Sequence, residues 1–258
     1  HAWFIESRKS AQNAYCDYYI WRKGKPAGEY PEPNNWGSFF SGSTWKYDES
    51  TDEWFLHLFS ARQPDLNWEN PAVRGEIFSM MNWWVEKGVD GFRMDVINLI
   101  SKAPSLPNGA IYEGARYGDG SPYYMNGPRL VEFLDEMKQQ VLGKGDLVAI
   151  GETPGVNPAY ASILTNAENG PLDMLFHFEH MALDNDPAGS SKFDAVPWQL
   201  ADLKRVTVRW QEGFAGRGWN SLYFSNHDQP RQVSRFGNDD AFWKQSAKLL
   251  ATFLHTQQ

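Results

Sequence analysis

Short apolar segments alternate with longer amphipathic segments along the chain from about residue 70 onward. The apolar segments have the length and composition of strands, and they span 88–98, 147–152, 172–178 and 221–228. The amphipathic segments repeat their apolar residues every three or four positions, as helices do, and span 70–87, 128–142, 198–211 and 239–255, with a short helical turn at 158–165. Strands that alternate with helices form a parallel sheet. The sequence therefore predicts an α/β fold, either a doubly wound open sheet or a (β/α)8 barrel.

The helix expected at 70–87 has clear signals at both ends. Asn70 can cap its start, Pro71 suits its first turn, and Gly88 lies just past its end. Its apolar side chains recur every three or four residues, and we expect this stripe to face the protein interior. The stripe consists of Val73, Ile77, Met81 and Trp84.

Residues 1–65 differ from the rest because they are irregular and rich in glycine, proline, asparagine and aromatic residues. Two short strands are expected there, at 17–22 and 54–59. A second irregular stretch, 101–127, is long enough to be either functional or disordered. We therefore expect a loop-rich subdomain over 1–65 and an α/β domain over 66–258.

Charge and cysteine content argue against several classes of function. The net charge of the 258 residues is −8, which disfavours a surface for nucleic acid or for anionic membranes. Cys16 is the only cysteine, so an internal disulfide and a multi-cysteine metal site are both excluded. No segment approaches the roughly 18 apolar residues of a membrane span. We expect no nucleic-acid or membrane partner.

Acidic residues end three of the four expected strands, namely Asp95, Glu152 and Asp228. No glycine-rich phosphate turn follows any of these strands, which weakens a nucleotide-binding open sheet. In a barrel, catalytic groups come from the carboxyl ends of several strands and converge on one pocket. The pattern therefore favours the barrel, with the three acids in a common site.

Arg93 and Asp95 lie two residues apart and should share one face of a buried strand, with Phe92, Met94 and Val96 on the other. Buried charges are costly unless they are paired, and such a pair can be purely structural or can serve catalysis.

Two convergent carboxylates suit glycoside hydrolysis, in which one is ionised and the other carries a proton. Arg93 would hold Asp95 ionised. Glu152 follows an apolar strand and has no basic neighbour in sequence, so it is the expected acid. His227 could be a structural histidine or a group that meets the sugar.

Four segments resemble, in their order and spacing, signature motifs of the alpha-amylase family of glycoside hydrolases. They read QPDLN at 63–67, GFRMD at 91–95, GETPG at 151–155 and NHDQPR at 226–231. Within the family the similarity is to oligo-1,6-glucosidases and dextran glucosidases. It implies a (β/α)8 TIM barrel that is partial here, with roughly strands 4–7 present. A loop-rich domain would be inserted after strand 3, and 1–65 would be most of it.

The resemblance also implies that 66–258 forms only part of the catalytic barrel. The first strands, the last strand and the C-terminal β-domain of the family would lie outside this chain. Because missing strands leave unpaired edges, we expect a chain of this extent to be poorly stable and weakly active or inactive alone. Some relatives bind calcium near the first strand, which is not in this chain, and no metal or cofactor is expected.

By the same resemblance, the enzyme would be a retaining α-glucosidase of the bacterial cytoplasm. It would release terminal α-1,6-linked, or α-1,4-linked, glucose from short oligosaccharides. Asp95 would be the nucleophile, Glu152 the acid and base, and Asp228 the group that binds the ring hydroxyls. The residues expected to hold the glucose are Arg93, His227 and Arg231. Val96, directly after the nucleophile, resembles the residue of members that prefer α-1,6 bonds.

Two alternatives remain open from the sequence. One is a transglucosylase or isomerase of the same family, of the sucrose isomerase or trehalose synthase type. The sequence after Asp228, RQVSRFGND at 231–239, is more similar to the hydrolases than to sucrose isomerases, which carry a charged loop there. The other is a non-catalytic barrel that serves as a binding module. The presence of all three acids argues against it.

Overall fold

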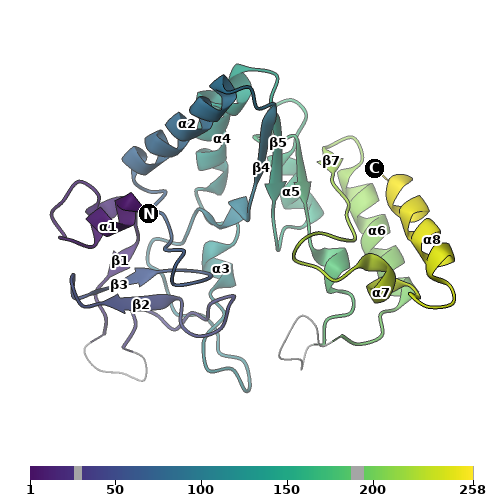
Figure 1. The fold of residues 1–258 in the computed structure, drawn as a ribbon, viewed down its shortest axis with the longest axis horizontal. Helices are drawn as coiled ribbons and strands as arrows, with labels where there is room; N and C mark the ends of the chain where they lie inside the picture. The colour runs from purple at the N-terminus through teal and green to yellow at the C-terminus, as the bar shows by residue number, and fades with distance from the viewer. Residues whose placement is uncertain (26–30, 187–194, 258) are drawn as a thin grey trace. The chain divides into compact units, whose positions relative to one another are not determined.

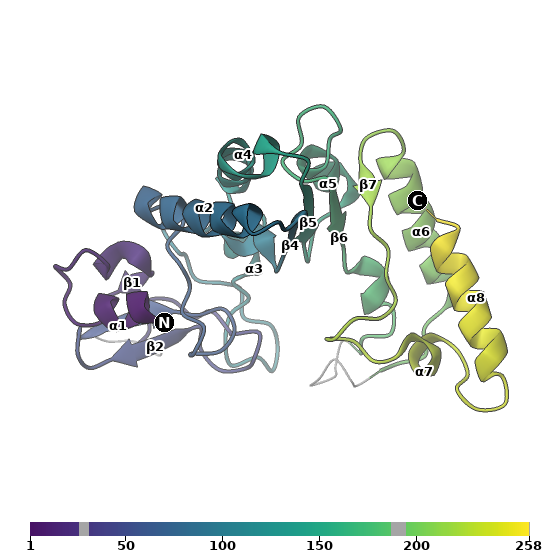
Figure 2. The same cartoon turned by 45° about the horizontal axis from the view of Figure 1, so that its top comes forward.

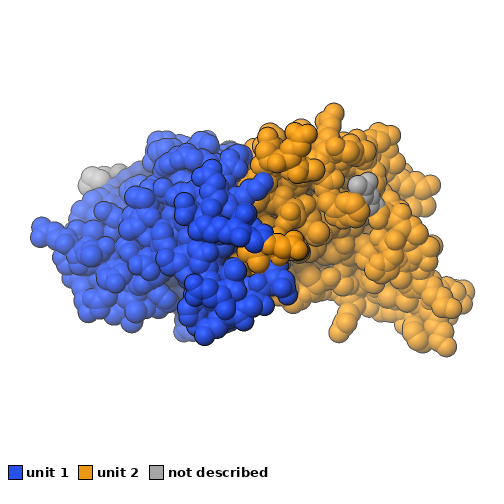
Figure 3. Space-filling view, turned by 90° about the horizontal axis from the view of Figure 1, so that it is seen from above, with its two compact units in different colours: residues 1–90, 98–145 blue, residues 91–97, 146–258 orange. Residues whose placement is uncertain are grey.

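The computed structural model describes residues 1–25, 31–186 and 195–257. Figure 3 shows two compact units, one formed by His1–Asp90 and Asn98–Gly145 and the other by Gly91–Ile97 and Asp146–Gln258. We describe each unit by itself. Within the described ranges, no helix combines the length and the apolar character needed to cross a membrane.

The described residues of the first unit form a small antiparallel sheet and four helices (Figure 1). The strands are β1 (Trp21–Arg22), β2 (Trp45–Asp48) and β3 (Glu53–Leu56), in the order β1-β3-β2. The helices are α1 (Ala2–Ser7), α2 (Pro71–Glu86), α3 (Ser121–Tyr124) and α4 (Leu130–Gln140), with 3-10 turns at Cys16–Tyr18 and Leu142–Lys144. The strands expected at 17–22 and 54–59 are confirmed only in shorter form, and β2 was not predicted.

Helix α2 begins and ends where its sequence predicts. The Asn70 side chain accepts a hydrogen bond from the Ala72 N–H at 2.9 Å, and Pro71 occupies the first turn. Gly88 follows the helix with φ +93°, a left-handed conformation that suits glycine.

The apolar face of α2 is rotated from the expected stripe. Val73, Phe78 and Met81 are buried, whereas Trp84 is 45% exposed, so its expected burial is wrong. Arg74 lies on the buried face, where its guanidinium donates to the Trp68 carbonyl at 2.7 Å.

The irregular stretch 101–127 is ordered by contacts with Trp36, which is fully buried. The Trp36 indole N–H donates to the Pro107 carbonyl at 2.8 Å, and its ring stacks with Tyr123 at 6.2 Å between centroids. The Asn35 side chain bonds both backbone groups of Gly109. Together with helix α3 and a β-bridge between Ala110 and Asp119, these polar and aromatic contacts give the stretch a defined conformation.

The second unit is built on a four-stranded parallel sheet in the order β4-β5-β6-β7 (Figure 2). The strands are β4 (Gly91–Met94), β5 (Val148–Glu152), β6 (Met174–Phe176) and β7 (Trp219–Asn220). The helices are α5 (Pro158–Leu164), α6 (Leu200–Phe214), α7 (Gln232–Phe236) and α8 (Trp243–His255), with a 3-10 turn at Glu179–Ala182. A further 3-10 turn, Ile97–Leu99, spans the point where the chain passes from this unit back to the first. The parallel sheet confirms the expected α/β class.

Strand β4 is shorter and more exposed than predicted. It ends at Met94, and the chain turns at Asp95 and Val96, so the expected alternation stops before Val96. Phe92 and Met94 are only partly buried. At Gly91 the two strands approach closely, because a Cβ there would lie 2.1 Å from the Val148 carbonyl oxygen.

The fourth strand lies earlier than the sequence predicts. The expected strand 221–228 is wrong, since β7 is Trp219–Asn220. The Ser221 N–H still reaches the Leu175 carbonyl at 3.1 Å, but β6 ends at Phe176. A strand needs a partner for its backbone groups, and beyond this point β6 offers none.

The core of this unit fills the space between α6, α7 and α8. It is formed by Met181, Leu203, Tyr223, Phe224, Phe236 and Leu250. The helix expected at 198–211 repeats its apolar residues every three or four positions, and of these Leu203, Val206 and Trp210 are buried. Figure 2 shows α8 running along α6. This packing anchors the segment that follows β7.

Candidate active site

Two acidic residues stand side by side at the carboxyl ends of neighbouring parallel strands. Asp95 directly follows β4, and Glu152 is the last residue of β5. The register pairs Met94 with Gly151, and the residue that follows each of them in the chain is one of the two acids. Their side chains are within hydrogen-bonding contact. The sheet therefore brings together the pair that the sequence predicts.

Arg93 bridges this pair. One guanidinium nitrogen, Nη1, is bonded to Oδ1 of Asp95, and the other, Nη2, lies 2.9 Å from Oε2 of Glu152. The Asp95 side chain is 71% exposed, whereas that of Glu152 is only 6% exposed. Glu152 has no basic neighbour in sequence, but the pairing of β4 with β5 supplies Arg93 as a partner from across the sheet.

The pKa values of the two carboxyls move apart. The limited burial of Asp95 would raise its pKa, but hydrogen bonds from Arg93 and Glu152, with the charges of Arg93 and His227, lower it. Burial raises the pKa of Glu152, and the bond to Asp95 adds to this. These effects outweigh the Val96 N–H and the charge of Arg93, which lower the pKa of Glu152. Asp95 is thus suited to be ionised while Glu152 keeps a proton.

Val96 takes part through its backbone, which sequence reasoning did not foresee. Its N–H donates to Oε2 of Glu152 at 3.2 Å. Its φ is +36°, in the left-handed region that β-branched residues rarely occupy. No sequence signal marks this conformation, because valine is a typical strand residue.

The remaining candidates lie on the segment between β7 and α7. His227 and Asp228 form a close pair, with Nε2 of His227 3.1 Å from Oδ2 of Asp228. Arg231 is exposed and precedes the first turn of α7. Asp228 does not end a strand, so the expectation of three strand-terminal acids is wrong for this residue. It belongs to a turn in which its N–H donates to the Asn226 side chain at 2.9 Å.

Tyr223 is a further residue that the sequence did not single out. It is buried, its ring packs against Phe176 and Phe178, and burial together with the charge of Glu152 raises its pKa. Phe176 is the register partner of Glu152. Phe176 therefore lies beside Glu152 on the neighbouring strand, and Tyr223 packs on Phe176.

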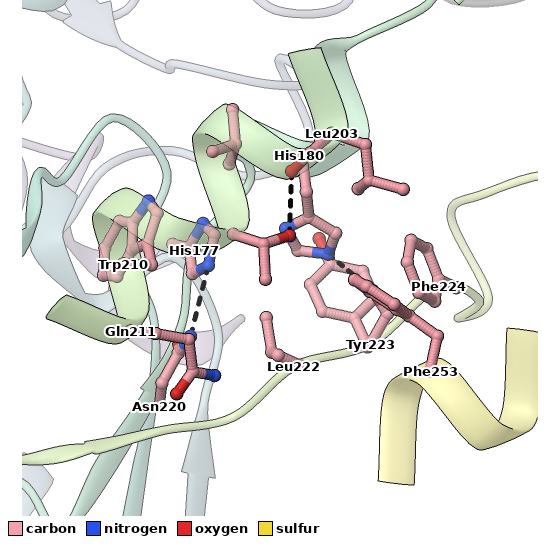
Figure 4. Close-up of a pocket in the computed structure, with 12 residues that line it drawn as sticks. His177, His180, Leu203, Trp210, Gln211, Asn220, Leu222, Tyr223, Phe224 and Phe253 are labelled. Carbon is pink, nitrogen blue, oxygen red and sulfur yellow. Dashed lines mark hydrogen bonds between the residues drawn. The ribbon is translucent and has the colours of Figure 1, made fainter. Parts of the chain in front are cut away.

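A small cavity of about 10 Å³ lies in the core of the second unit (Figure 4). It is lined by His177, His180, Trp210, Asn220 and Tyr223, among others. It has room for about one water molecule and none for a sugar. Within the described ranges, no group of three or more His, Cys, Asp or Glu side chains could hold a metal ion.

Comparisons with known proteins place these residues in a family. A family model, that of the alpha-amylase catalytic domain, matches residues 1–258. An oligo-1,6-glucosidase from Parageobacillus thermoglucosidasius is 59% identical over 258 residues, which cover 100% of this chain and 45% of that protein.

Solved structures agree with this assignment. Trehalose-6-phosphate hydrolase from Bacillus licheniformis aligns with a TM-score of 0.92 at 42% identity, over 100% of this chain and 45% of that one. Isomaltulose synthase from Erwinia rhapontici, solved with D-glucose, aligns with a TM-score of 0.89 at 34% identity, again over 100% and 45%. This chain therefore spans a little under half the length of these relatives.

The catalytic domain of the family is a (β/α)8 barrel, and the parallel strands β4–β7 form a part of it. The match over all 258 residues shows that the chain belongs to the alpha-amylase family of glycoside hydrolases.

Proposed function

We propose that this chain carries the catalytic carboxyls of a retaining α-glucosidase that removes terminal α-1,6-linked glucose from short oligosaccharides. One observation carries the proposal: Asp95 and Glu152 are in contact around Arg93, with pKa values shifted in opposite directions. The 59% identity to an oligo-1,6-glucosidase supports the choice of substrate.

In the first step the ionised carboxylate of Asp95 attacks the anomeric carbon of the terminal glucose. The bond from that carbon to the glycosidic oxygen breaks, and the proton of Glu152 passes to this oxygen. The glucose is left as an ester of Asp95, and Glu152 is left ionised. The contact between the carboxyls favours this route, because an inverting enzyme separates them by roughly 6.5–9.5 Å to admit water.

In the second step Glu152 acts as a base. Its carboxylate takes a proton from a water molecule, whose oxygen attacks the anomeric carbon and displaces Asp95. Glucose leaves with its original anomeric configuration. Both carboxyls return to their starting protonation states, and Arg93 keeps its contacts with the pair.

The other candidates would bind the sugar. Asp228 and His227 are exposed as a pair, so both can exchange their mutual contact for contacts with ring hydroxyls. We assign Asp228 to the hydroxyls next to the anomeric centre, where it also stabilises the positive charge of the transition state. Arg93, His227 and Arg231 would hold the rest of the glucose.

Val96 is proposed to bias the enzyme toward α-1,6 bonds. Its side chain follows the nucleophile directly and would stand beside the leaving group. A difference of about one methylene group changes selectivity by roughly 10–200-fold at most. Replacement of Val96 by a smaller residue is therefore expected to shift the ratio of α-1,6 to α-1,4 activity without abolishing either.

The proposal includes the expected organisation of the whole enzyme. Residues 1–65 would be most of a loop-rich domain inserted into the barrel, and 66–258 would be part of the barrel itself. A cytoplasmic enzyme with a soluble oligosaccharide substrate fits the family resemblance.

The test uses the complete natural protein that contains this sequence. Hydrolysis of p-nitrophenyl α-glucoside and of isomaltose is measured for it and for Asp95→Asn. The substitution should abolish turnover, because an amide is a poor nucleophile. Asp90→Asn, at the opposite end of β4, is the matched control and should retain activity.

Two results would contradict the proposal. If Asp95→Asn kept its activity, the nucleophile would be misassigned or the barrel would act only as a binding module. If proton NMR of the first product showed the β-anomer of glucose, the mechanism would not be retaining.

An isomerase of the same family is the second candidate. The similarity to isomaltulose synthase, with a TM-score of 0.89, supports it, although the 34% identity is well below that to the glucosidase. Chromatography of the products formed from sucrose would separate the two functions. A rearranged disaccharide would indicate an isomerase, and free glucose with fructose a hydrolase.

A further inference from the structure

The backbone of Val96 adopts a conformation that its own side chain disfavours. The φ of +36° lies in the left-handed region, where a β-branched Cβ crowds the neighbouring carbonyl. Strained residues of this kind persist where the surroundings impose them, and they cluster at functional sites. Val96 sits between the expected nucleophile and the 3-10 turn at Ile97–Leu99.

This conformation turns the Val96 N–H toward Glu152. The N–H donates to Oε2 at 3.2 Å, and Nη2 of Arg93 lies 2.9 Å from the same oxygen. A neutral carboxyl carries its proton on one of its two oxygens, and the protonated oxygen is a poor hydrogen-bond acceptor. Oε2 already accepts from the Val96 N–H and from Arg93, so a proton on Oε2 would oppose both donors. The proton of Glu152 is therefore excluded from Oε2.

We propose that Val96 is a positioning residue, whose backbone N–H fixes Glu152 so that Oε1 carries and delivers the catalytic proton. The inference rests on the proposed function and deepens it. The side chain of Val96 is not needed for this role. What matters is the direction of its N–H, which the left-handed turn after β4 sets.

The surroundings of Glu152 determine how removal of this bond would act. The charged and titratable groups that face it are Arg93 from β4, Asp95 from the turn after β4, and Tyr223 from the segment after β7. From β6 it meets the apolar Phe176. The Val96 N–H favours the ionised carboxyl, so it lowers the pKa of Glu152 against the effect of burial.

The experiment replaces the Val96 amide by an ester in the complete natural protein. Nonsense suppression with the α-hydroxy analogue of valine removes the N–H and keeps the side chain. Without this hydrogen bond the ionised form of Glu152 is less stable, so its pKa should rise. The basic limb of the kcat/KM profile, which reports loss of the proton from Glu152, should then move up by about one pH unit. A residue with only a structural role would lower the rate without moving this limb.

Val96→Gly is the matched control. Glycine adopts the left-handed conformation without strain and keeps the N–H, so the basic limb should stay where it is in the unsubstituted protein. An ester variant with an unmoved basic limb would overturn the inference. The inference would also be overturned if the basic limb of Val96→Gly moved as far as that of the ester variant.

Failure of the inference differs from failure of the proposed function. If the unsubstituted protein does not hydrolyse p-nitrophenyl α-glucoside, the proposed function is wrong. If it does, and the ester leaves the pH profile unchanged, only the role of Val96 is wrong.

Discussion

Two buried histidines should make the second unit sensitive to acid. His177 stacks on Trp210 with 3.6 Å between ring centroids, and its Nδ1 accepts a hydrogen bond from the Glu179 N–H at 3.4 Å. A proton on Nδ1 would face this donor. Nε2 of His180 contacts the Tyr223 carbonyl at 2.5 Å. Among the described residues Nδ1 of His180 has no hydrogen-bond partner, so a proton there would be buried without an acceptor.

Burial lowers the pKa of both rings from 6.5, to about 2 for His177 and about 4 for His180. The charges of His180 and Arg209 also lower the pKa of His177. The hydrogen bond to the Tyr223 carbonyl raises the pKa of His180, but burial and the charge of Arg235 lower it by more. The unfolded chain therefore binds more protons than the folded one between these values and 6.5. Stability is fully present above pH 6.5 and decreases as the pH falls.

The size of the effect follows from the difference in bound protons. Each histidine that is neutral in the folded chain and charged in the unfolded chain lowers the unfolding free energy by about 1.4 kcal/mol for every unit by which the pH falls. Between the ordinary value of 6.5 and pH 5 this amounts to about 2 kcal/mol for each ring. The two together should remove about 4 kcal/mol of unfolding free energy.

Hydrogen exchange of the amides in α6, measured at pH 7.5 and at pH 5 and corrected for intrinsic rates, reports this free energy for the unit itself. The complete natural protein is compared with His177→Gln, His180→Gln and the double variant. Each substitution should reduce the loss of stability between the two pH values by about 2 kcal/mol. Other titrating groups cancel in the comparison. An equal loss in the parent and the double variant would refute the reasoning.

Three further predictions concern other residues of the same unit. Gly91→Ala should destabilise the sheet by about 1–3 kcal/mol, because the new Cβ would lie 2.1 Å from the Val148 carbonyl oxygen. Unchanged thermal unfolding would show that β4 and β5 approach less closely. Arg235→Met leaves Asp184 buried without its ion pair and should cost about 3–5 kcal/mol, measured by denaturant unfolding, whereas a loss below about 1 kcal/mol would contradict a buried pair. Glu152→Gln should lower kcat roughly 10²–10⁴-fold on isomaltose, with a much smaller loss on an aryl glucoside whose leaving group needs no proton. Equal losses on both substrates would argue against its role as acid.

Local signals made much of the fold predictable. Asn70 and Pro71 mark the start of α2 because capping depends on neighbours in sequence, and the apolar stripe of α6 follows from helical periodicity. Glu152 could be placed at a strand end because β5 is an uninterrupted apolar segment. The contact between Asp95 and Glu152 then follows from parallel pairing, which the alternation of strands and helices predicts.

Features that depend on partners across the sheet could not be predicted. Strand β7 lies earlier than its most apolar residues because β6 ends at Phe176 and leaves them unpaired. The bond between Arg93 and Glu152 arises from register, and the left-handed φ of Val96 from the turn that follows β4. Trp84 is exposed although its spacing fits the stripe, since the buried face of α2 is set by what packs on it.

The bridge made by Arg93 has a consequence for the electrostatics of the proposed cycle. Before reaction the guanidinium is balanced by Asp95, with Glu152 neutral. Once Asp95 is esterified it has no charge, and Glu152, having given up its proton, becomes the counter-ion. The negative charge thus moves from one carboxyl to the other around a fixed cation, and the total stays constant. A site that conserves its charge needs little rearrangement of nearby dipoles as the reaction proceeds, so the rigid end of a sheet can serve both half-reactions.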